Sequence, residues 1–258
     1  MMRRDRDKGR SPLGAEQTIW DTKRLSDPHG QPDKAARVEA MFEAIAPTYE
    51  LVNSVLSAGR DSYWRQRAVA VARLSAGDRV LDLCCGTGDL ARALVKESPA
   101  AVVGCDFSQR MLELAAGRNS LPIHWCRADA QSLPFADGSF SLVGCAFGVR
   151  NFQELGRGLE EMHRVLRRGG RAVILEFSTP RAPVLGGLYG FYFRRVLPRL
   201  AALISRDRVG AYRYLAKSVS SFVGDAGMIK ELRSAGFSRV ECHRLTIGMV
   251  TVFAAWRE

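Results

Sequence analysis

The sequence has no apolar run approaching the ~18 residues that cross a bilayer as a helix. Its first ten residues are mostly charged and lack the apolar core of a signal peptide. We therefore expect a cytoplasmic protein, in which 258 residues form one or two domains.

Residue spacings typical of metal-binding sites are also missing. The chain has six cysteines, at positions 84, 85, 105, 126, 145 and 242. They form no C-x-x-C pair and no Cys/His spacing of the kind that binds zinc. Most of them stand in or beside apolar, strand-like runs, where cysteine usually serves as a small buried hydrophobe. We expect reduced thiols and no metal site.

Acidic residues are few compared with basic ones. Lys and Arg number 38 against 27 Asp and Glu, a formal net charge of +11 that would suit nucleic acid, a membrane surface or an acidic ligand. No signature of a nucleic-acid-binding module is present, so we expect no nucleic-acid partner. Between positions 181 and 217 the chain has eight basic residues and one acid, interspersed with aromatic side chains. The charge is thus concentrated in one segment.

What the sequence does contain is a strand followed by a glycine turn. Residues 79–83 are an apolar run, Gly86 and Gly88 follow, and a helical pattern begins at Asp89. Eighteen residues beyond Gly88, a second apolar run ends in Asp106. In parallel α/β sheets such a turn lets the backbone approach a ligand, and an acid after the next strand accepts hydrogen bonds from ribose hydroxyls. The two features predict a cofactor that contains a nucleoside.

Two cofactors satisfy this pattern. The spacing Gly86-x-Gly88-x-x-Ala91 fits the dinucleotide fingerprint, which leaves an NAD-dependent oxidoreductase open. Dinucleotide domains often open on their first strand, however, whereas a long polar and helical stretch precedes this one. Asp82, inside the strand, would also attract a cationic ligand group and repel a pyrophosphate. These observations favour S-adenosylmethionine, which has an amino group, a sulfonium and no phosphate.

Strand and helix patterns alternate along the rest of the chain and predict an α/β fold. The further strands are expected at 101–106, 123–127, 140–147, 171–177 and, as an antiparallel pair, near 237–244 and 248–256. Residues 1–33 are polar and charged, which is typical of a disordered tail, and 34–258 would form the folded domain. Within that domain we expect a helical cap at 34–75 and a helical lid inserted at 181–222.

The chain resembles the ubiquinone/menaquinone biosynthesis C-methyltransferase family over about 38–257. The glycine turn and the loop Leu133-Pro134-Phe135 are shared by many methyltransferases. Narrower matches are Phe147-Gly148-Val149-Arg150-Asn151, Leu175-Glu176-Phe177-Ser178 and Tyr212-x-Tyr214-Leu215-x2-Ser218. The resemblance implies a class I methyltransferase fold, a Rossmann-like, seven-stranded and mostly parallel sheet with helices on both faces.

The resemblance also implies the reaction, transfer of a methyl group from S-adenosylmethionine to a ring carbon of a demethylated isoprenoid quinol. The form Cys84-Cys85-Gly86-Thr87-Gly88 is closer to the menaquinone-type members, which favours 2-demethylmenaquinol as the substrate. A ubiquinone-pathway benzoquinol is the alternative. A further alternative is a domain that binds the cofactor without catalysing a reaction.

Six residues would bind the cofactor. By resemblance, Gly86, Thr87 and Gly88 would wrap its methionine part and Asp106 would accept from the ribose hydroxyls. Asp129 and Ala130 would flank the adenine, and a loop cap is the alternative role for Asp129. A hydroxyl contact offered by some relatives should be absent here, because Ala146 stands at that position.

Three residues would act on the quinol. The ring carbon is a poor nucleophile until the adjacent hydroxyl begins to ionise, and Arg150 is a permanent cation that would stabilise the phenolate. Asn151 would hydrogen-bond the same oxygen, and Tyr49 would orient the ring or relay a proton. A surface ion pair is the alternative role for Arg150. Glu176 is a weaker candidate for proton acceptor, and pairing with a neighbouring arginine suits it equally well.

The isoprenoid tail of such a substrate lies in the bilayer. Residues 184–204 combine apolar and aromatic side chains with Arg194, Arg195 and Arg199, which suits an interfacial segment that rests on anionic lipid. We therefore expect a peripheral contact at the inner face of the cell membrane. A lid that packs on the sheet or on a second subunit of a homodimer is the alternative.

Overall fold

The computed structural model describes residues 18–49, 54, 57, 59–118, 121–178 and 209–258. They build a seven-stranded sheet in the order β3-β2-β1-β4-β5-β7-β6, parallel except where β7 pairs with β5 and β6. This confirms the predicted α/β fold. The strands are β1 (Arg79–Leu83), β2 (Ala101–Asp106), β3 (Ile123–Arg127), β4 (Phe140–Ala146), β5 (Leu166–Phe177), β6 (Arg239–Leu245) and β7 (Val250–Trp256).

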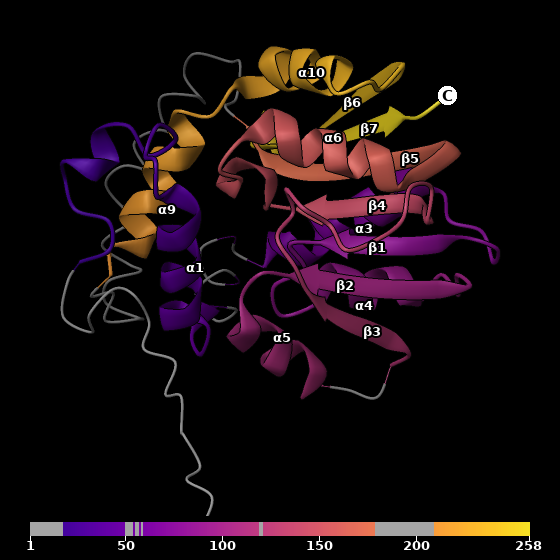
Figure 1. Cartoon of the computed structure of the whole chain (residues 1–258), viewed down its shortest axis with the longest axis horizontal. Coiled ribbons are helices and arrows are strands. Elements are labelled where there is room, and N and C mark those ends of the chain that lie inside the picture. The colour runs from indigo at the N-terminus through magenta and orange to yellow at the C-terminus, as the bar shows by residue number, and fades with distance from the viewer. Residues whose placement is uncertain (1–17, 50–53, 55–56, 58, 119–120, 179–208) are drawn as a thin grey trace, which may run out of the picture.

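Helices cover both faces of the sheet (Figure 1). One face carries α3 and α4, the other carries α6 and α10, and α5 packs beside β2 and β3. The crossover helices α4, α5 and α6 lie against strands that flank them in the chain, as parallel sheets require, whereas α3 contacts β5 and β7. The helices are α1 (Lys34–Ile45), α3 (Arg60–Ala72), α4 (Asp89–Val95), α5 (Gln109–Ala116), α6 (Leu155–Val165), α9 (Ala211–Ser220) and α10 (Gly224–Ser234).

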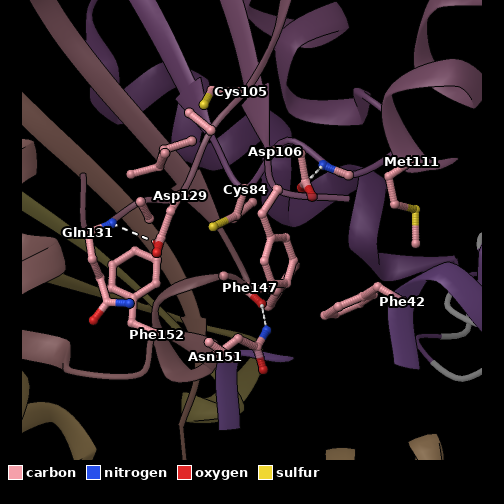
Figure 2. Close-up of a pocket in the computed structure, with 18 of the residues that line it drawn as sticks. Phe42, Cys84, Cys105, Asp106, Met111, Asp129, Gln131, Phe147, Asn151 and Phe152 are labelled. Atoms are coloured by element: carbon pink, nitrogen blue, oxygen red, sulfur yellow. Dashed lines mark hydrogen bonds between the residues drawn. The ribbon is translucent and has the colours of Figure 1, made fainter. Parts of the chain in front are cut away.

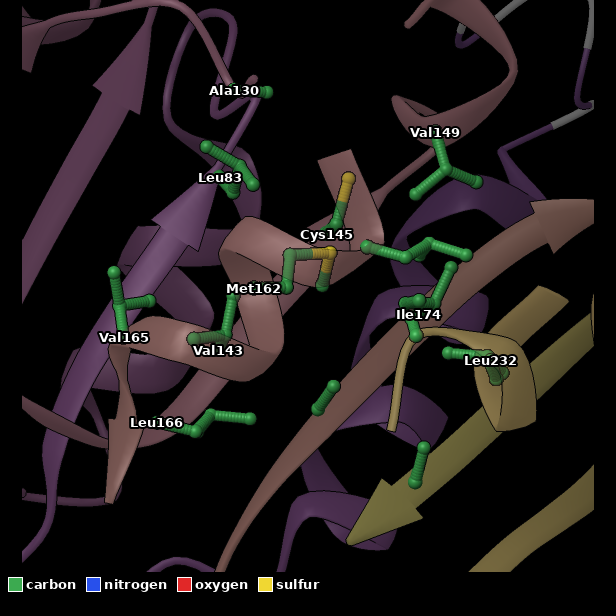
Figure 3. Close-up of a cluster of buried hydrophobic side chains, with 14 of the residues drawn as sticks. Leu83, Ala130, Val143, Cys145, Val149, Met162, Val165, Leu166, Ile174 and Leu232 are labelled. Carbon is green, nitrogen blue, oxygen red and sulfur yellow. The ribbon is translucent and has the colours of Figure 1, made fainter. Parts of the chain in front are cut away.

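Side-chain alternation along each strand divides the core into two layers. In β1, Val80 packs in the layer with α3 and α4, whereas Leu81 and Leu83 pack in the layer with α6 and α10. Figure 3 shows this second layer, in which Met162 of α6 and Leu232 of α10 belong to the same buried cluster. Because both faces are covered, inner strands such as β4 are buried along almost their whole length, whereas the edge strands β3 and β6 are largely exposed or half-buried.

One boundary differs from expectation. β5 begins at Leu166, directly after α6, rather than at Arg171. Leu166 pairs with Phe140 of β4, and the Gly169 N–H donates to the Arg257 carbonyl. Hydrogen bonds to residues far away in the sequence thus extend the strand through a glycine pair that locally suits a helix end.

Of the helical cap expected at 34–75, α1 lies at the carboxyl ends of the parallel strands, where it runs beside α9 (Figure 1). α3, which falls in the same expected range, packs instead on the face of the sheet against β5 and β7. α1 begins at Lys34 as predicted, and Val38, Met41 and Ile45 of its apolar stripe are buried. These side chains share a cluster with Tyr214 and other residues of α9. Helix α1 and part of the expected lid are therefore one packing unit.

Residues 18–33 also belong to this unit, in contrast to the polar tail expected there. Trp20 is fully buried and stacks on Tyr214 of α9, with 4.2 Å between the ring centroids. Arg37 of α1 donates to the Ile19 carbonyl at 3.1 Å. The free energy gained by burying one large aromatic ring fixes this segment to the fold despite its polar composition. Positions 1–17 and 179–208, which hold the rest of the expected tail and lid, lie outside the described residues.

Within the described part of the chain, none of the helices has both the length and the apolar content needed to cross a membrane.

Candidate functional site

A cavity of about 670 Å³, partly open to solvent, lies at the carboxyl ends of β1, β2 and β4. β1 lies between β2 and β4, so the order of the strands reverses here, and parallel α/β sheets bind ligands at such a point. Ala35 and Phe42 of α1 also line the cavity, which places this helix opposite the sheet. Figure 2 shows Phe42 across the cavity from Phe147 and Asp106.

The glycine turn contributes one of its three predicted residues to the cavity wall. Gly86 lines it with φ at +53°, and a side chain there would point toward Tyr49, whose Cε1 is 4.0 Å from the position of an added Cβ. Gly88 instead packs against Trp125, which an added Cβ would approach to 2.5 Å. Thr87 is buried, and its carbonyl accepts from Arg92 at 2.8 Å. The turn thus offers an open surface at Gly86, while Gly88 permits close packing of α4.

Asp106 lines the cavity at the end of β2. Its two carboxylate oxygens accept backbone N–H groups, Oδ2 from Gly86 at 2.8 Å and Oδ1 from Ser108 at 2.9 Å. Burial raises the pKa of Asp106 to about 6, against the effect of these two hydrogen bonds. Each carboxylate oxygen has a second lone pair, so the group retains capacity for ligand hydroxyls.

Asp129 and Ala130 line the same cavity. The Oδ1 atom of Asp129 accepts from the Gln131 N–H at 2.9 Å, which is the loop-capping contact given as the alternative for this residue. The cap uses one carboxylate oxygen and leaves the group at the cavity wall (Figure 2). Both roles for Asp129 are therefore compatible in this geometry.

Two loops at the cavity hold a non-glycine residue in the left-handed region. Cys84 after β1 has φ of 55°, and Phe147 after β4 has φ of 58°. The loops meet at Gly148, where an added Cβ would lie 2.6 Å from the Cβ of Cys84. Such backbone strain is costly and concentrates at functional sites. It is consistent with a ligand site at these two strand ends.

Arg150 lies beside the cavity and not in its wall. Its side chain is buried, Nη1 is 2.9 Å from Oε1 of Glu176 on β5, and Nη1 also donates to the Phe147 carbonyl. The pair is an internal one, and not the surface ion pair given as the alternative. Glu176 is thus the partner of a neighbouring arginine, one of the two roles expected for it.

Asn151 and Tyr49 line the cavity, and their contact with the acceptor stays a prediction. The Asn151 Oδ1 accepts from the Tyr214 hydroxyl at 3.0 Å, and its Nδ2 donates to the Phe147 carbonyl at 3.4 Å. Burial raises the pKa of Tyr214, which keeps this hydroxyl a donor. Tyr214 is thus a further residue of the site, and it lies in one of the narrow family motifs although the sequence predicts no role for it.

Asp82 does not reach the cavity. It is fully buried on the face of β1 that carries Val80, under α3 and α4, and burial raises its pKa to about 8. The expectation that it would receive a cationic ligand group is therefore not met, because the strand directs its side chain away from the cavity.

The residues present suit a nucleoside with a charged side arm. The open face at Gly86 and the carboxylates of Asp106 and Asp129 provide acceptors for hydroxyl and amino groups. Apolar rings, among them Phe42 and Phe107, line the space between them. Within the described ranges, no cluster of three or more His, Cys, Asp or Glu has a metal-binding arrangement.

Comparison with known proteins decides between the two cofactor classes. The model of the ubiE/COQ5 methyltransferase family matches residues 31–257. The chain belongs to this family. The prediction of a methyltransferase is confirmed, and the NAD-dependent oxidoreductase is set aside.

The names of curated relatives agree with the assignment of this chain to the ubiE/COQ5 family. It is 46% identical to a demethylmenaquinone methyltransferase of Thermus thermophilus, over 82% of this chain and 97% of the relative. It is 45% identical to a Deinococcus radiodurans protein of the same name, over 84% and 91%. A ubiquinone/menaquinone biosynthesis C-methyltransferase of Geotalea uraniireducens is 42% identical, over 86% and 96%. The chain is a C-methyltransferase of this family.

Solved structures support the fold of the family member. A SAM-dependent methyltransferase of Thermotoga maritima superposes with a TM-score of 0.61 at 20% identity, over 85% of this chain and 99% of that one. The [4+2]-cyclase SpnF also superposes, with a TM-score of 0.56 at 17% identity, over 86% and 95%. Since a cyclase shares the fold, the fold alone does not decide the activity.

Proposed function

We propose that this protein transfers a methyl group from S-adenosylmethionine to a ring carbon of 2-demethylmenaquinol. One observation carries the proposal. A single cavity is lined both by residues suited to the cofactor, Asp106 and Asp129, and by residues suited to a phenolic acceptor, Tyr49 and Asn151. A transferase that holds two reactants side by side gains most of its rate from such positioning.

S-adenosylmethionine supplies an electrophilic methyl group on a sulfonium. Gly86 would leave room for its methionine part, Asp106 would accept from the ribose hydroxyls, and Asp129 and Ala130 would flank the adenine. Thr87 and Gly88 would hold the shape of the turn. Asp106 already accepts from the Gly86 N–H, so ribose binding and the position of the turn would be coupled through one carboxylate.

The acceptor would lie against Asn151 and Tyr49. Because Asn151 Oδ1 accepts from Tyr214, its NH₂ group is directed to the Phe147 carbonyl and has a second N–H for a ligand oxygen. A donor at this point favours an acceptor oxygen, as in an ionising ring hydroxyl. Arg150 would act indirectly, by holding the loop that presents Asn151.

The preference for a naphthoquinol rests on the relatives named demethylmenaquinone methyltransferase. The test is to assay the purified protein with a naphthoquinol and a benzoquinol, each with labelled S-adenosylmethionine. We expect label in the naphthoquinol. Label in the benzoquinol alone would reverse the substrate assignment, and label in neither ring would refute the proposed reaction.

A separate titration addresses the cofactor. We expect calorimetric binding of S-adenosylmethionine and none of NAD. Binding without methyl transfer to any quinol would favour a domain that holds the cofactor without chemistry.

Contact with the membrane stays a prediction from the sequence, because 184–204 lies outside the described residues. Flotation with anionic liposomes across a salt series would test it, with an Arg194/Arg195/Arg199→Gln variant as the comparison. Binding at low salt that the variant loses would support a peripheral contact. Sedimentation of the same protein would distinguish a monomer from a homodimer.

A further inference from the structure

Lys34, the first residue of α1, is a buried cation beside the cavity. Its side chain is only 3% exposed. The Nζ atom donates to the Phe152 carbonyl at 2.6 Å and lies 3.3 Å from Nδ1 of His29. Phe152 lines the cavity next to Asn151, so the ammonium lies directly behind that part of the wall.

The same end of α1 is attached to this wall by its neighbours. The Ala35 N–H donates to Oε1 of Gln153 at 2.9 Å, and Nε2 of Gln153 donates to the Gln31 carbonyl at 3.0 Å. Ala35 and Gln153 both line the cavity. The position of Lys34 relative to the cavity is therefore set by three hydrogen bonds to the loop that follows Asn151, two from α1 and one from Gln31 just before it.

The groups around Lys34 compensate its charge only in part, because the carboxylate of Asp27 acts on it without forming an ion pair. Burial and the Lys34 charge lower the pKa of His29, so His29 is neutral near pH 7. Arg150 is paired with Glu176, which balances its charge, although Arg150 still disfavours a second cation at Lys34. Tyr214 keeps its proton, since burial raises its pKa. Asp27 is exposed, and within the described residues no carboxylate lies within 4.0 Å of the Lys34 ammonium.

An ammonium without a counter-ion is costly to bury. Burial and the charge of Arg150 lower the pKa of Lys34 to about 8, which still leaves the group mostly charged at neutral pH. A positive charge that stays buried at this cost in free energy favours the binding of an anion nearby. The cavity wall in front of Lys34 is where the proposed acceptor would lie.

We propose that Lys34 supplies the positive charge that stabilises the ionised ring oxygen of the acceptor, a task that the neutralised Arg150–Glu176 pair does not perform. The inference rests on the proposed function. Lys34 keeps its protons and forms no bond to the ring, so its role is that of an electrostatic positioning residue acting through the wall at Phe152.

The test uses two unreactive rings, so that it does not depend on turnover. 2-Hydroxy-1,4-naphthoquinone is ionised at neutral pH, and 2-methyl-1,4-naphthoquinone is neutral. Their dissociation constants are measured by tryptophan fluorescence at pH 7. We expect the wild type to prefer the ionised ring by about tenfold or more, Lys34→Met to lose the preference and Lys34→Arg to keep it. Lys96→Met, at an exposed position, is the matched control and should behave as the wild type does.

The outcomes separate the two proposals. If the wild type binds neither ring, the proposed quinol site fails. If it binds both rings and Lys34→Met retains the preference for the anion, the role of Lys34 is refuted while the quinol site stands.

A pH series keeps the inference testable even if Lys34→Met does not fold. In the wild type, the preference should decline as the pH rises through about 8, where Lys34 loses its proton. The pKa of His29 is lowered, so it titrates below this range, and the pKa of Tyr214 is raised, so it titrates above it. A preference that is unchanged up to pH 10 would refute the assignment.

Discussion

The Arg150 guanidinium lies 2.9 Å from the Glu176 carboxylate, and both side chains are buried, with exposed fractions of 7% and 1%. The Glu176 Oε2 also accepts from the Arg150 N–H at 3.4 Å, and the guanidinium lies over the Phe177 ring at 5.5 Å. The pair thus joins the loop after β4 to the end of β5, directly behind the cavity. Its first role is to hold two strand ends together.

We expect Glu176→Gln to destabilise the fold by about 3–5 kcal/mol, because it leaves the Arg150 charge buried without a counter-ion. Urea denaturation measures the loss. Glu241→Gln, which breaks an exposed pair with Arg239, is the control and should have a much smaller effect. Similar losses in both variants would mean that the buried pair contributes no more than a surface pair does.

Gly86 and Gly169 provide a matched pair of substitutions. Both have positive φ, +53° and +74°, so Ala at either position should cost about 1–2 kcal/mol of stability. Gly169 has no atom within 4 Å of an added Cβ, whereas Gly86 faces the cavity toward Tyr49. We therefore expect only Gly86→Ala to weaken the binding of S-adenosylmethionine, as measured by calorimetry. Equal affinities for the two variants would exclude a ligand contact at Gly86.

Tyr214→Phe removes the hydroxyl that orients the Asn151 amide. We expect a stability loss of about 0.5–1.5 kcal/mol and a lower kcat with the quinol, while the Kd of S-adenosylmethionine is unchanged. The half-exposed Tyr63 on α3 offers a control, Tyr63→Phe, that removes a hydroxyl away from the cavity. If Tyr214→Phe retains the wild-type kcat, the orientation of Asn151 does not depend on this bond.

The raised pKa of Asp106, about 6, predicts a pH dependence of cofactor binding. Below pH 6 the carboxyl is protonated in the free protein and loses acceptor capacity, so the affinity for S-adenosylmethionine should fall as the pH is lowered from 7 to 5. Asp106→Asn should bind more weakly at pH 7 and show little change over this range. A wild-type affinity that is constant from pH 5 to 7 would contradict the ribose-acceptor role.

Much of the fold follows from local sequence patterns. The apolar runs at β1, β2, β3 and β4 predict strands because both faces of a parallel sheet are covered, and the glycine turn follows β1 directly. A serine directly before a helical pattern is typical of an N-cap, and the hydroxyl of Ser108 accepts from the Met111 N–H at 3.2 Å. Such features depend on neighbours a few residues away, so the sequence by itself determines them, together with the family to which the chain belongs.

The tertiary structure alone decided which polar groups meet behind the cavity. Lys34 contacts Phe152 across 118 positions, and Tyr214 contacts Asn151 across 63. Lys34 stands in no pattern that predicts a role, and the family motif that contains Tyr214 does not reveal its contact with Asn151. The balance of charge around Arg150 depends on Glu176, 26 positions away on another strand. The sequence shows which charged groups the protein has. Only the folded structure decides which of them are buried and paired, and therefore which net charge a ligand meets. The physical reason is that the free-energy cost of a buried charge depends on the partners that lie next to it.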